Sequence, residues 1–431
     1  MKTAIVVGSG AGGSTVAKEL QGDFQVTVLE AGGPFKPFDG NLRMLEQARR
    51  RLAGLFFSER QIEWLVPHMK VARTADGMVL VKGIGQGGST TLSTGSAVRH
   101  DHDLKALGIE LDDEFESLTR ELPISTGHQA RWHAPTREAY RVCRDLGLEP
   151  QPTPKMIRLE RCISCGRCVL GCARGAKWDS REQLQQAVDN GTQLLPGCSV
   201  REVVIEGGRA IGVRTANGSR GRLHRADLIV LAAGGFGTPA LLQRSGLECT
   251  GGLFVDPVLC VAARWKGAAQ HHELPMPFIV QAEHYAISPY FDYLSYFFDR
   301  NWRHPAGDIF SLMIKLADTS AGTVTHKGVR KHLQQSDQAH LRDGVDRCKV
   351  ILHGMGARDA DIFLGTLNAG HPGGMLPLTE RESRTLHHEH LPANLYVADA
   401  TLLPHSMGNP PILTIMALAR RVALRARERA G

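Results

Sequence analysis

The chain has 431 residues, of which 42% are hydrophobic and 22% charged. This length suits two or three domains of an ordinary globular protein. The formal charge of +7 favours an anionic substrate or partner, although a mildly basic surface without a special partner is the plainer interpretation. No long basic run with interleaved aromatic residues indicates nucleic-acid binding, and no run of about 18 apolar residues indicates a membrane span. Because the chain enters its first strand without a signal peptide, we expect a cytoplasmic protein.

The first thirty residues predict a strand, a glycine turn, a helix and a second strand. An apolar run over 2–7 precedes the motif GxGxxG, and a helix is expected over 14–20. The three glycines permit a tight turn, the approach of a pyrophosphate to the backbone, and close helix packing. An acid about 20 residues on can bind an adenosine ribose hydroxyl. The motif predicts a site for NAD or FAD at Gly8, Gly10, Ala11, Gly13 and Glu30.

Further elements follow in chain order. Residues 41–65 are predicted to be an amphipathic helix, and a strand from residue 79 ends in a second glycine-rich loop, which brings N–H groups near a bound anion or ring. Asn217-Gly218 is a hairpin signal, and a buried strand over 227–233 returns to the nucleotide-binding sheet. An aromatic stretch over 288–302 is expected to be core, and residues 391–431 predict a strand, a turn and a long helix. A group of histidines is expected to be exposed and is assigned no metal: His387, His388 and His390.

The most specific chemical signal is a run of four cysteines with the spacing CxxCxxCxxxC. A bacterial ferredoxin wraps thiolates of this spacing around an iron–sulfur cluster. We therefore predict a [4Fe–4S] cluster, with the last cysteine of the run or a distant one as fourth ligand. Zinc and bare structural thiols are the alternatives, and disulfides fit a cytosolic chain poorly. Nearby basic residues would offset an anionic cluster and dock an acidic electron-carrier protein. The predicted ligands are Cys162, Cys165, Cys168 and Cys172, and the basic residues are Arg161, Arg167, Arg174 and Lys177.

Four separated blocks of the sequence resemble the glucose-methanol-choline (GMC) family of flavin oxidoreductases. They are VVGSGAGGSTVAKEL with VLEAG, GIGQGGSTTLSTGSAVR, IVLAAGGFGTPALLQRSG and NLYVADATLLPHSMGNPPILTIMALA. The resemblance implies that FAD is the cofactor. It implies that the first block binds the diphosphate and ribose, that the second lies against the isoalloxazine, and that the last runs under the ring. Val200 would touch the adenine through its backbone, and the other cofactor-binding residues implied are Gly87, Gly88, Ser89, Asp399, Ala400 and Pro411.

The resemblance also implies an α/β fold with a Rossmann-like FAD-binding domain and an inserted α+β substrate domain on an antiparallel sheet. The FAD-binding domain would comprise residues 1–100, 181–250 and 366–431. Residues 101–180 would form a cap and cysteine-cluster segment, and residues 251–365 the substrate-binding domain. Since the chain is short for the family, we expect a reduced roof over a more open flavin.

Members of this family oxidise an alcohol to a carbonyl, passing a hydride to flavin N5 while a histidine takes the hydroxyl proton. That histidine lies in an HPxGT-like motif, which GHPGGM matches in part, so the resemblance indicates His371 as the base. The alternative is a histidine that only bonds a nearby carbonyl. The family's second catalytic position, His or Asn before a proline, aligns without gaps to Pro410. Either Asn409, one place earlier, takes that role or the role is missing, and Ser93 replaces an asparagine of the family.

We predict an FAD-dependent alcohol dehydrogenase that passes electrons through the cluster to a protein acceptor. A flavin accepts a hydride and a cluster carries one electron, so the pairing favours a dehydrogenase over an oxygen-using oxidase. The alternatives are an alcohol oxidase with structural cysteines, an electron-transfer subunit of a larger complex, and reduction or desaturation on the same flavin. The aromatic content of residues 285–302 favours a hydrophobic or cyclic alcohol over a sugar.

Overall fold

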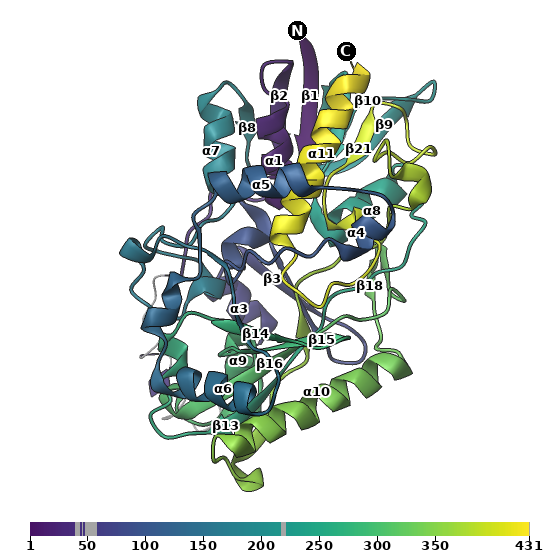
Figure 1. Ribbon diagram of the computed structural model, residues 1–431. Coiled ribbons are helices and arrows are strands. Elements are labelled where there is room, and N and C mark those ends of the chain that lie inside the picture. The colour runs from purple at the N-terminus through teal and green to yellow at the C-terminus, as the bar shows by residue number, and fades with distance from the viewer. Residues whose placement is uncertain (39–43, 45, 48–57, 217–220, 431) are drawn as a thin grey trace.

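The computed structural model describes residues 1–38, 44, 46–47, 58–216 and 221–430. One large sheet lies at the end of the molecule that carries both termini, and a second lies toward the opposite end (Figure 1). The expected α/β class, with a Rossmann-like part and a second sheet that is largely antiparallel, is confirmed. Among the residues described, no helix is both long and apolar enough to cross a bilayer.

The first sheet is a five-stranded parallel sheet in the order β21-β12-β1-β2-β8. Its central strands are buried apolar runs, as parallel strands covered on both faces must be. The strands are β1 (Lys2–Val7), β2 (Phe24–Leu29), β8 (Gln193–Leu195), β12 (Leu228–Leu231) and β21 (Leu395–Val397).

Helix α1 (Ala11–Glu19) begins three residues before the predicted start at Ser14. Gly10 caps it in an extended conformation, so the helix follows directly on the second glycine of the motif. A Cβ on Gly13 would lie 2.0 Å from the Gly8 carbonyl oxygen. Only glycine therefore lets α1 pack this closely on the end of β1.

Several helices and a small sheet pack around the parallel sheet. Helix α1 packs against α11 and α7, α11 packs against α5, and α8 packs against β9. The buried Arg420 of α11 pairs with Glu19 at 2.7 Å and with Glu121 at 2.8 Å, which fixes α11 to α1 and α5. The bounds are α5 (Asp112–Glu121), α7 (Arg181–Asp189), α8 (Gly234–Arg244), α11 (Ile412–Ala430), β9 (Val200–Glu206), β10 (Arg209–Thr215) and β11 (Leu223–Arg225).

The second sheet has nine strands in the order β3-β4-β20-β13-β16-β15-β14-β6, with β19 also paired to β13. Every residue of β16 is buried, and helix α10 packs on β16 and β15. The bounds are β3 (Met69–Arg73), β4 (Val79–Gly83), β6 (Gln151–Pro152), β13 (Val258–Arg264), β14 (Phe278–Gln281), β15 (Tyr285–Pro289), β16 (Ile309–Leu316), β19 (Ile362–Leu364), β20 (Asn368–Ala369) and α10 (Gln335–Gly354).

Three strands of the second sheet come from segments that the sequence assigns to the FAD-binding domain. They are β3 and β4, from residues 1–100, and β20, from residues 366–431. The domain boundaries stay a prediction. Smaller elements complete the chain: α3 (Glu59–Leu65), α4 (His102–Ala106), α6 (Ala134–Asp145), α9 (Tyr293–Phe298), the pair β5 (Ile124–Ser125) and β7 (Lys155–Met156), and the pair β17 (Thr323–Thr325) and β18 (Gly328–Arg330).

The predictions for individual segments differ in outcome. The helix predicted over 41–65 lies largely outside the described residues, as does the turn at Asn217-Gly218, although β10 and β11 on either side of that turn do pair antiparallel. The aromatic stretch is core, as predicted. The expectation that the late histidines are exposed is wrong for His387 and His388. Both are buried, and each ring bonds a backbone carbonyl, of Pro392 and Leu376 respectively.

Candidate active site

The two glycine-rich loops lie against each other. The second loop leads from β4 into the short 3-10 helix η1 (Gly88–Leu92), and Gly87 donates its N–H to Ser9 Oγ at 3.2 Å. Gly87 and Gly88 have positive φ angles of 90° and 52°, which favour glycine. The Ser89 hydroxyl accepts the Gly83 N–H at 3.0 Å and closes the loop. The segments predicted to bind the diphosphate and the ring are thus adjacent.

Gly10 is the residue whose identity the fold does not explain. Its φ of −74° and ψ of −162° are accessible to any residue. A Cβ there would meet nothing closer than the Gly88 Cα, at 4.0 Å. The N–H groups of the first turn of α1 receive no side-chain cap from Gly10, and Ala11 begins that turn. An uncapped helix N-terminus beside free space fits the diphosphate of FAD.

The Glu30 carboxylate is buried at the end of β2 and accepts hydrogen bonds from neighbouring groups. Its partners are Ser9 Oγ at 2.6 Å, Ser9 N–H at 3.0 Å and Gly32 N–H at 2.9 Å. The Glu30 carbonyl accepts the Cys198 N–H at 2.8 Å, which brings the start of β9, and Val200, close to this end of the sheet. The predicted ribose and adenine contacts therefore belong to one corner of the molecule.

Asp399 joins the C-terminal block to helix α8. Its buried carboxylate accepts from Gly234 N–H at 2.8 Å, Thr238 Oγ1 at 2.5 Å and Thr401 N–H at 2.8 Å. Burial raises the pKa of Asp399, and these hydrogen bonds oppose the rise. The next carbonyl, of Ala400, accepts the Gly374 N–H at 3.1 Å. This bond ties the block to the loop that carries His371.

The His371 ring has one buried and one open side. The Nδ1 atom is buried without a hydrogen-bond partner, whereas the side chain as a whole is 32% exposed. The exposure therefore falls on the rest of the ring. Burial, and then the charge of Lys315, lower the pKa of His371 well below its ordinary value. The imidazole is neutral at neutral pH, as a proton acceptor must be.

Asn409 lies in the buried turn that leads into α11. Its Nδ2 donates to Gln281 Oε1 at 2.9 Å, and its Oδ1 is buried without a partner. The Pro411 carbonyl accepts the Ile415 N–H at 2.9 Å and starts the helix. The Gly408 N–H reaches Asp256 Oδ1 at 3.4 Å, and Asp256 Oδ2 lies 3.7 Å from His371 Nδ1. Asp256 thus connects the two segments that carry the predicted catalytic residues.

Sequence reasoning missed Asp256 and its partner Lys315. Both side chains are 1% exposed, and their Oδ2 and Nζ atoms are 2.7 Å apart. The available signal was a single lysine inside the apolar run IFSLMIKL, where a buried strand would otherwise carry no charge.

The cysteine loop packs against η1. A 3-10 turn, η4 (Cys168–Leu170), contacts η1, and Lys177 donates to the Thr90 and Thr91 carbonyls at 2.8 Å each. Gly166 has a positive φ, and a Cβ there would lie 2.1 Å from the His271 carbonyl oxygen. The four thiols are free, and burial raises the pKa of Cys168 to about 12. Within the described ranges, no three His, Cys, Asp or Glu side chains are arranged to hold a metal ion.

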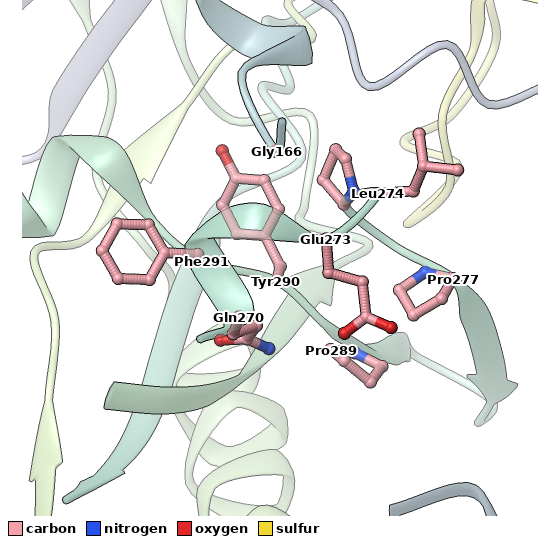
Figure 2. Close-up of a pocket in the computed structure, with 9 residues that line it drawn as sticks. Gly166, Gln270, Glu273, Leu274, Pro277, Pro289, Tyr290 and Phe291 are labelled. Carbon is pink, nitrogen blue, oxygen red and sulfur yellow. The ribbon is translucent and has the colours of Figure 1, made fainter. Parts of the chain in front are cut away.

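Two buried lysines lie beside these thiols. Lys155 donates to Ser96 Oγ at 2.8 Å and to the Pro275 carbonyl at 2.7 Å, and burial lowers its pKa to about 7. For the part of the chain described, neither Lys155 nor Lys177 has a carboxylate within ion-pair distance. A small pocket of about 10 Å³, room for one water, adjoins the loop at Gly166. Figure 2 shows that Tyr290, Glu273 and Gln270 also line it.

Comparison with known proteins decides the family. Residues 3–253, more than half of the chain, match the family model described as GMC oxidoreductase. The chain belongs to the GMC oxidoreductase family. It is therefore an FAD-dependent oxidoreductase, and the predicted family, fold and flavin cofactor are confirmed.

Similar proteins align with nearly the whole chain. An uncharacterized protein of Methanocaldococcus jannaschii is 24% identical over 96% of this chain and 97% of its own length. A long-chain-alcohol oxidase of Arabidopsis thaliana is 23% identical over 99% of this chain and 66% of its own. The structure of pyridoxine 4-oxidase from Mesorbium loti superposes with a TM-score of 0.73 at 17% identity, covering 98% of this chain and 99% of that one. At that identity the likeness shows a common fold.

Proposed function

We propose that this GMC oxidoreductase oxidises the alcohol group of an apolar or ring-bearing substrate, with His371 as the base. The observation that carries the proposal is the His371 ring, which has a buried Nδ1 and an open opposite side. A base in this position needs a neutral nitrogen on the open side and support on the buried side. The partner-free Nδ1 speaks against the alternative, a histidine that only bonds a nearby carbonyl.

The proposed reaction divides between cofactor and protein. Bound FAD would supply the acceptor for a hydride from the substrate carbon that bears the hydroxyl group. His371 Nε2 takes the hydroxyl proton, so the alcohol leaves as a carbonyl compound. The partner-free Oδ1 of Asn409 would accept a hydrogen bond from the substrate hydroxyl group or from a water.

The substrate class rests on the names of relatives. The aromatic residues of segment 288–302 lie in the buried core, so they carry no argument about the substrate. Among similar proteins are oxidases named for long-chain alcohols and for pyridoxine, one apolar and one cyclic. An apolar or cyclic alcohol fits these names.

Electron transfer through a cysteine-ligated cluster to an acidic carrier protein stays a prediction, as does the cytoplasmic location. The spacing of the cysteines supports the cluster, and so do Lys155 and Lys177, two buried amino groups whose protonated forms would balance an anionic cluster. Against it, the described side chains form no metal site. The rival function, an oxygen-using oxidase with structural thiols, uses the same alcohol site and needs no metal.

The experiment is a panel of alcohols mixed with FAD-loaded protein without oxygen, followed by flavin absorbance and by product analysis. We expect bleaching and the matching aldehyde or ketone with long-chain or aromatic alcohols, and little with sugars. The same panel under air measures hydrogen peroxide, which separates an oxidase from a dehydrogenase. A flavin that no alcohol reduces would refute the proposal.

A further inference from the structure

The buried side of His371 faces an ion pair supplied by two other segments. Its Nδ1 lies 3.7 Å from Asp256 Oδ2, and the same oxygen accepts a hydrogen bond from Lys315 Nζ at 2.7 Å. Both partners are 1% exposed. One carboxylate oxygen therefore lies between an ammonium group and the imidazole.

The backbone holds these residues in register. Phe254 and Gly373 exchange two N–H···O bonds, at 3.2 Å and 3.1 Å, and the His371 N–H reaches the Val255 carbonyl at 3.3 Å. These bonds place the segment of Asp256 alongside that of His371. Lys315 arrives on β16, where it pairs with Val258 of β13. Three segments thus converge at one carboxylate.

Asp256 has a positive φ of 48°, an uncommon conformation for a residue other than glycine. Such strain persists where the surrounding structure fixes it, and it clusters at functional sites. Here the Asp256 N–H donates to Asp318 Oδ1 at 2.8 Å. The conformation turns the carboxylate toward His371 and Lys315.

A second buried pair completes the network. Asp318 Oδ2 lies 2.7 Å from Lys331 Nζ, and the Ser406 hydroxyl lies between the Asp256 and Asp318 carboxylates. Two carboxylates and two ammonium groups balance each other, which is the condition for burying four charges. Lys315, and not Lys331, donates to Asp256 Oδ2, the carboxylate oxygen that faces His371.

We propose that Asp256 and Lys315 are positioning residues for His371, an inference that deepens the proposed function and rests on it. The Asp256 carboxylate favours the ring tautomer that carries its proton on Nδ1, so the Nε2 lone pair faces the open side. Lys315 balances Asp256, and the ring stays neutral until a substrate proton arrives. When that proton moves from the substrate oxygen to Nε2, the new positive charge lies beside Asp256.

The charges around the ring agree with this role. Asp256 alone would favour the imidazolium and leave no free base, whereas Lys315 opposes it. Asp318 and Lys331 are mutually paired and add no net charge. The lowered pKa of His371 has burial as its first cause and Lys315 as its second, in line with the geometry.

The test follows the His371 ring by NMR in FAD-loaded protein labelled with ¹⁵N-histidine, without any substrate. The signal of His371 is the one lost in His371→Gln. In the wild type we expect a neutral ring protonated on Nδ1 at pH 7. Lys315→Met should move the His371 titration midpoint to higher pH. Lys331→Met is the matched control, because it removes an equally buried ammonium group from the same network, and its midpoint should stay near that of the wild type.

A double variant is included because Lys315→Met leaves Asp256 buried without its partner, which can prevent folding. Asp256→Asn/Lys315→Met removes both charges together, leaves no unpaired ion, and should raise the Nε2-protonated fraction of His371. Equal shifts in Lys315→Met and Lys331→Met, or an unchanged tautomer in the double variant, would overturn the inference. The NMR test needs no substrate, so it is independent of the proposed function. If the His371 shifts appear as expected but the protein oxidises no alcohol, the proposed function is rejected and the inference about Asp256 and Lys315 is kept.

Discussion

Gly88 lies directly against Gly10. A Cβ added to Gly88 would stand 3.0 Å from the Gly10 Cα, so the two glycine loops touch at this point. The two residues are glycine for different reasons. Gly88 needs its positive φ, whereas Gly10 has an ordinary backbone and free space around its Cβ position. We infer that a ligand, not the fold, requires glycine at position 10.

The substitution Gly10→Ala therefore separates binding from folding. The variant should fold with a thermal midpoint close to that of the wild type. Its affinity for FAD should fall by about 10- to 100-fold, because the methyl group occupies the space of the diphosphate. Titration of apoprotein with FAD measures this. Gly307→Ala, outside the glycine loops and with its Cβ at an ordinary contact distance of 3.7 Å from His271 Cε1, is the control and should bind FAD normally. Normal binding by folded Gly10→Ala would place the diphosphate elsewhere.

Asp399→Ala should lower the stability of the fold, because the substitution leaves two buried donors and one half-buried donor without this acceptor. We expect the free energy of unfolding to fall by about 3 kcal/mol. The matched control is Asp227→Ala. The Asp227 carboxylate accepts two hydrogen bonds from Thr3 at an exposed position, so its removal should lower the free energy of unfolding by about 1 kcal/mol or less. Denaturant unfolding measures both. Equal losses would mean that Asp399 has no special part in joining the C-terminal block to α8.

The pH dependence of kcat/KM should report the lowered pKa of His371. A base works when it is neutral, so the rate should be constant near neutral pH and fall only as the pH drops through that lowered pKa. The unfolded chain binds this proton first, near pH 6.5, so the contribution of His371 to stability is present above about pH 6.5 and is lost below it. A rate profile with its acid limb centred above about pH 6.5 would contradict the assignment.

Much of the nucleotide-binding part could be predicted because its signals are local. The β1–α1–β2 unit and its glycines follow from periodicity and spacing within thirty residues. The strands β3 and β4 could not be placed, since β4 pairs with β20, nearly three hundred residues later in the chain. His387 and His388 were misjudged as exposed because the carbonyls that satisfy their rings come from the fold and not from the motif.

In the candidate site, too, a local motif could be recognised, whereas contacts between distant segments could not. His371 was indicated by a motif, but Asp256 and Lys315 carry no motif and meet it only through backbone pairing between distant segments. A lysine within an apolar strand is normally taken to mark the end of the strand or an exposed position. Only the structure shows the buried carboxylate that pairs with it. Sequence alone therefore indicates the candidate base but misses the buried charged residues beside it.

Measuring the iron and acid-labile sulfide content of the protein tests whether the cysteine loop holds a cluster. The cluster prediction requires about four of each per chain in protein purified without oxygen. Cys165→Ser should lower both, whereas Cys198→Ser, at a buried cysteine outside the run, should not. Flavin without iron would make the four thiols structural and favour the oxidase. Neither result bears on the proposed alcohol site.

The most direct test of the central claim compares His371→Ala with His405→Ala, an exposed histidine in the segment that carries Ser406 and Asn409. Both FAD-loaded variants are mixed, without oxygen, with the best alcohol from the panel, and the rate of flavin reduction is measured. We predict that His371→Ala keeps its FAD and slows by about 10²- to 10⁴-fold, while His405→Ala matches the wild type. Reduction of folded His371→Ala at the wild-type rate would contradict the assignment of His371 as the base.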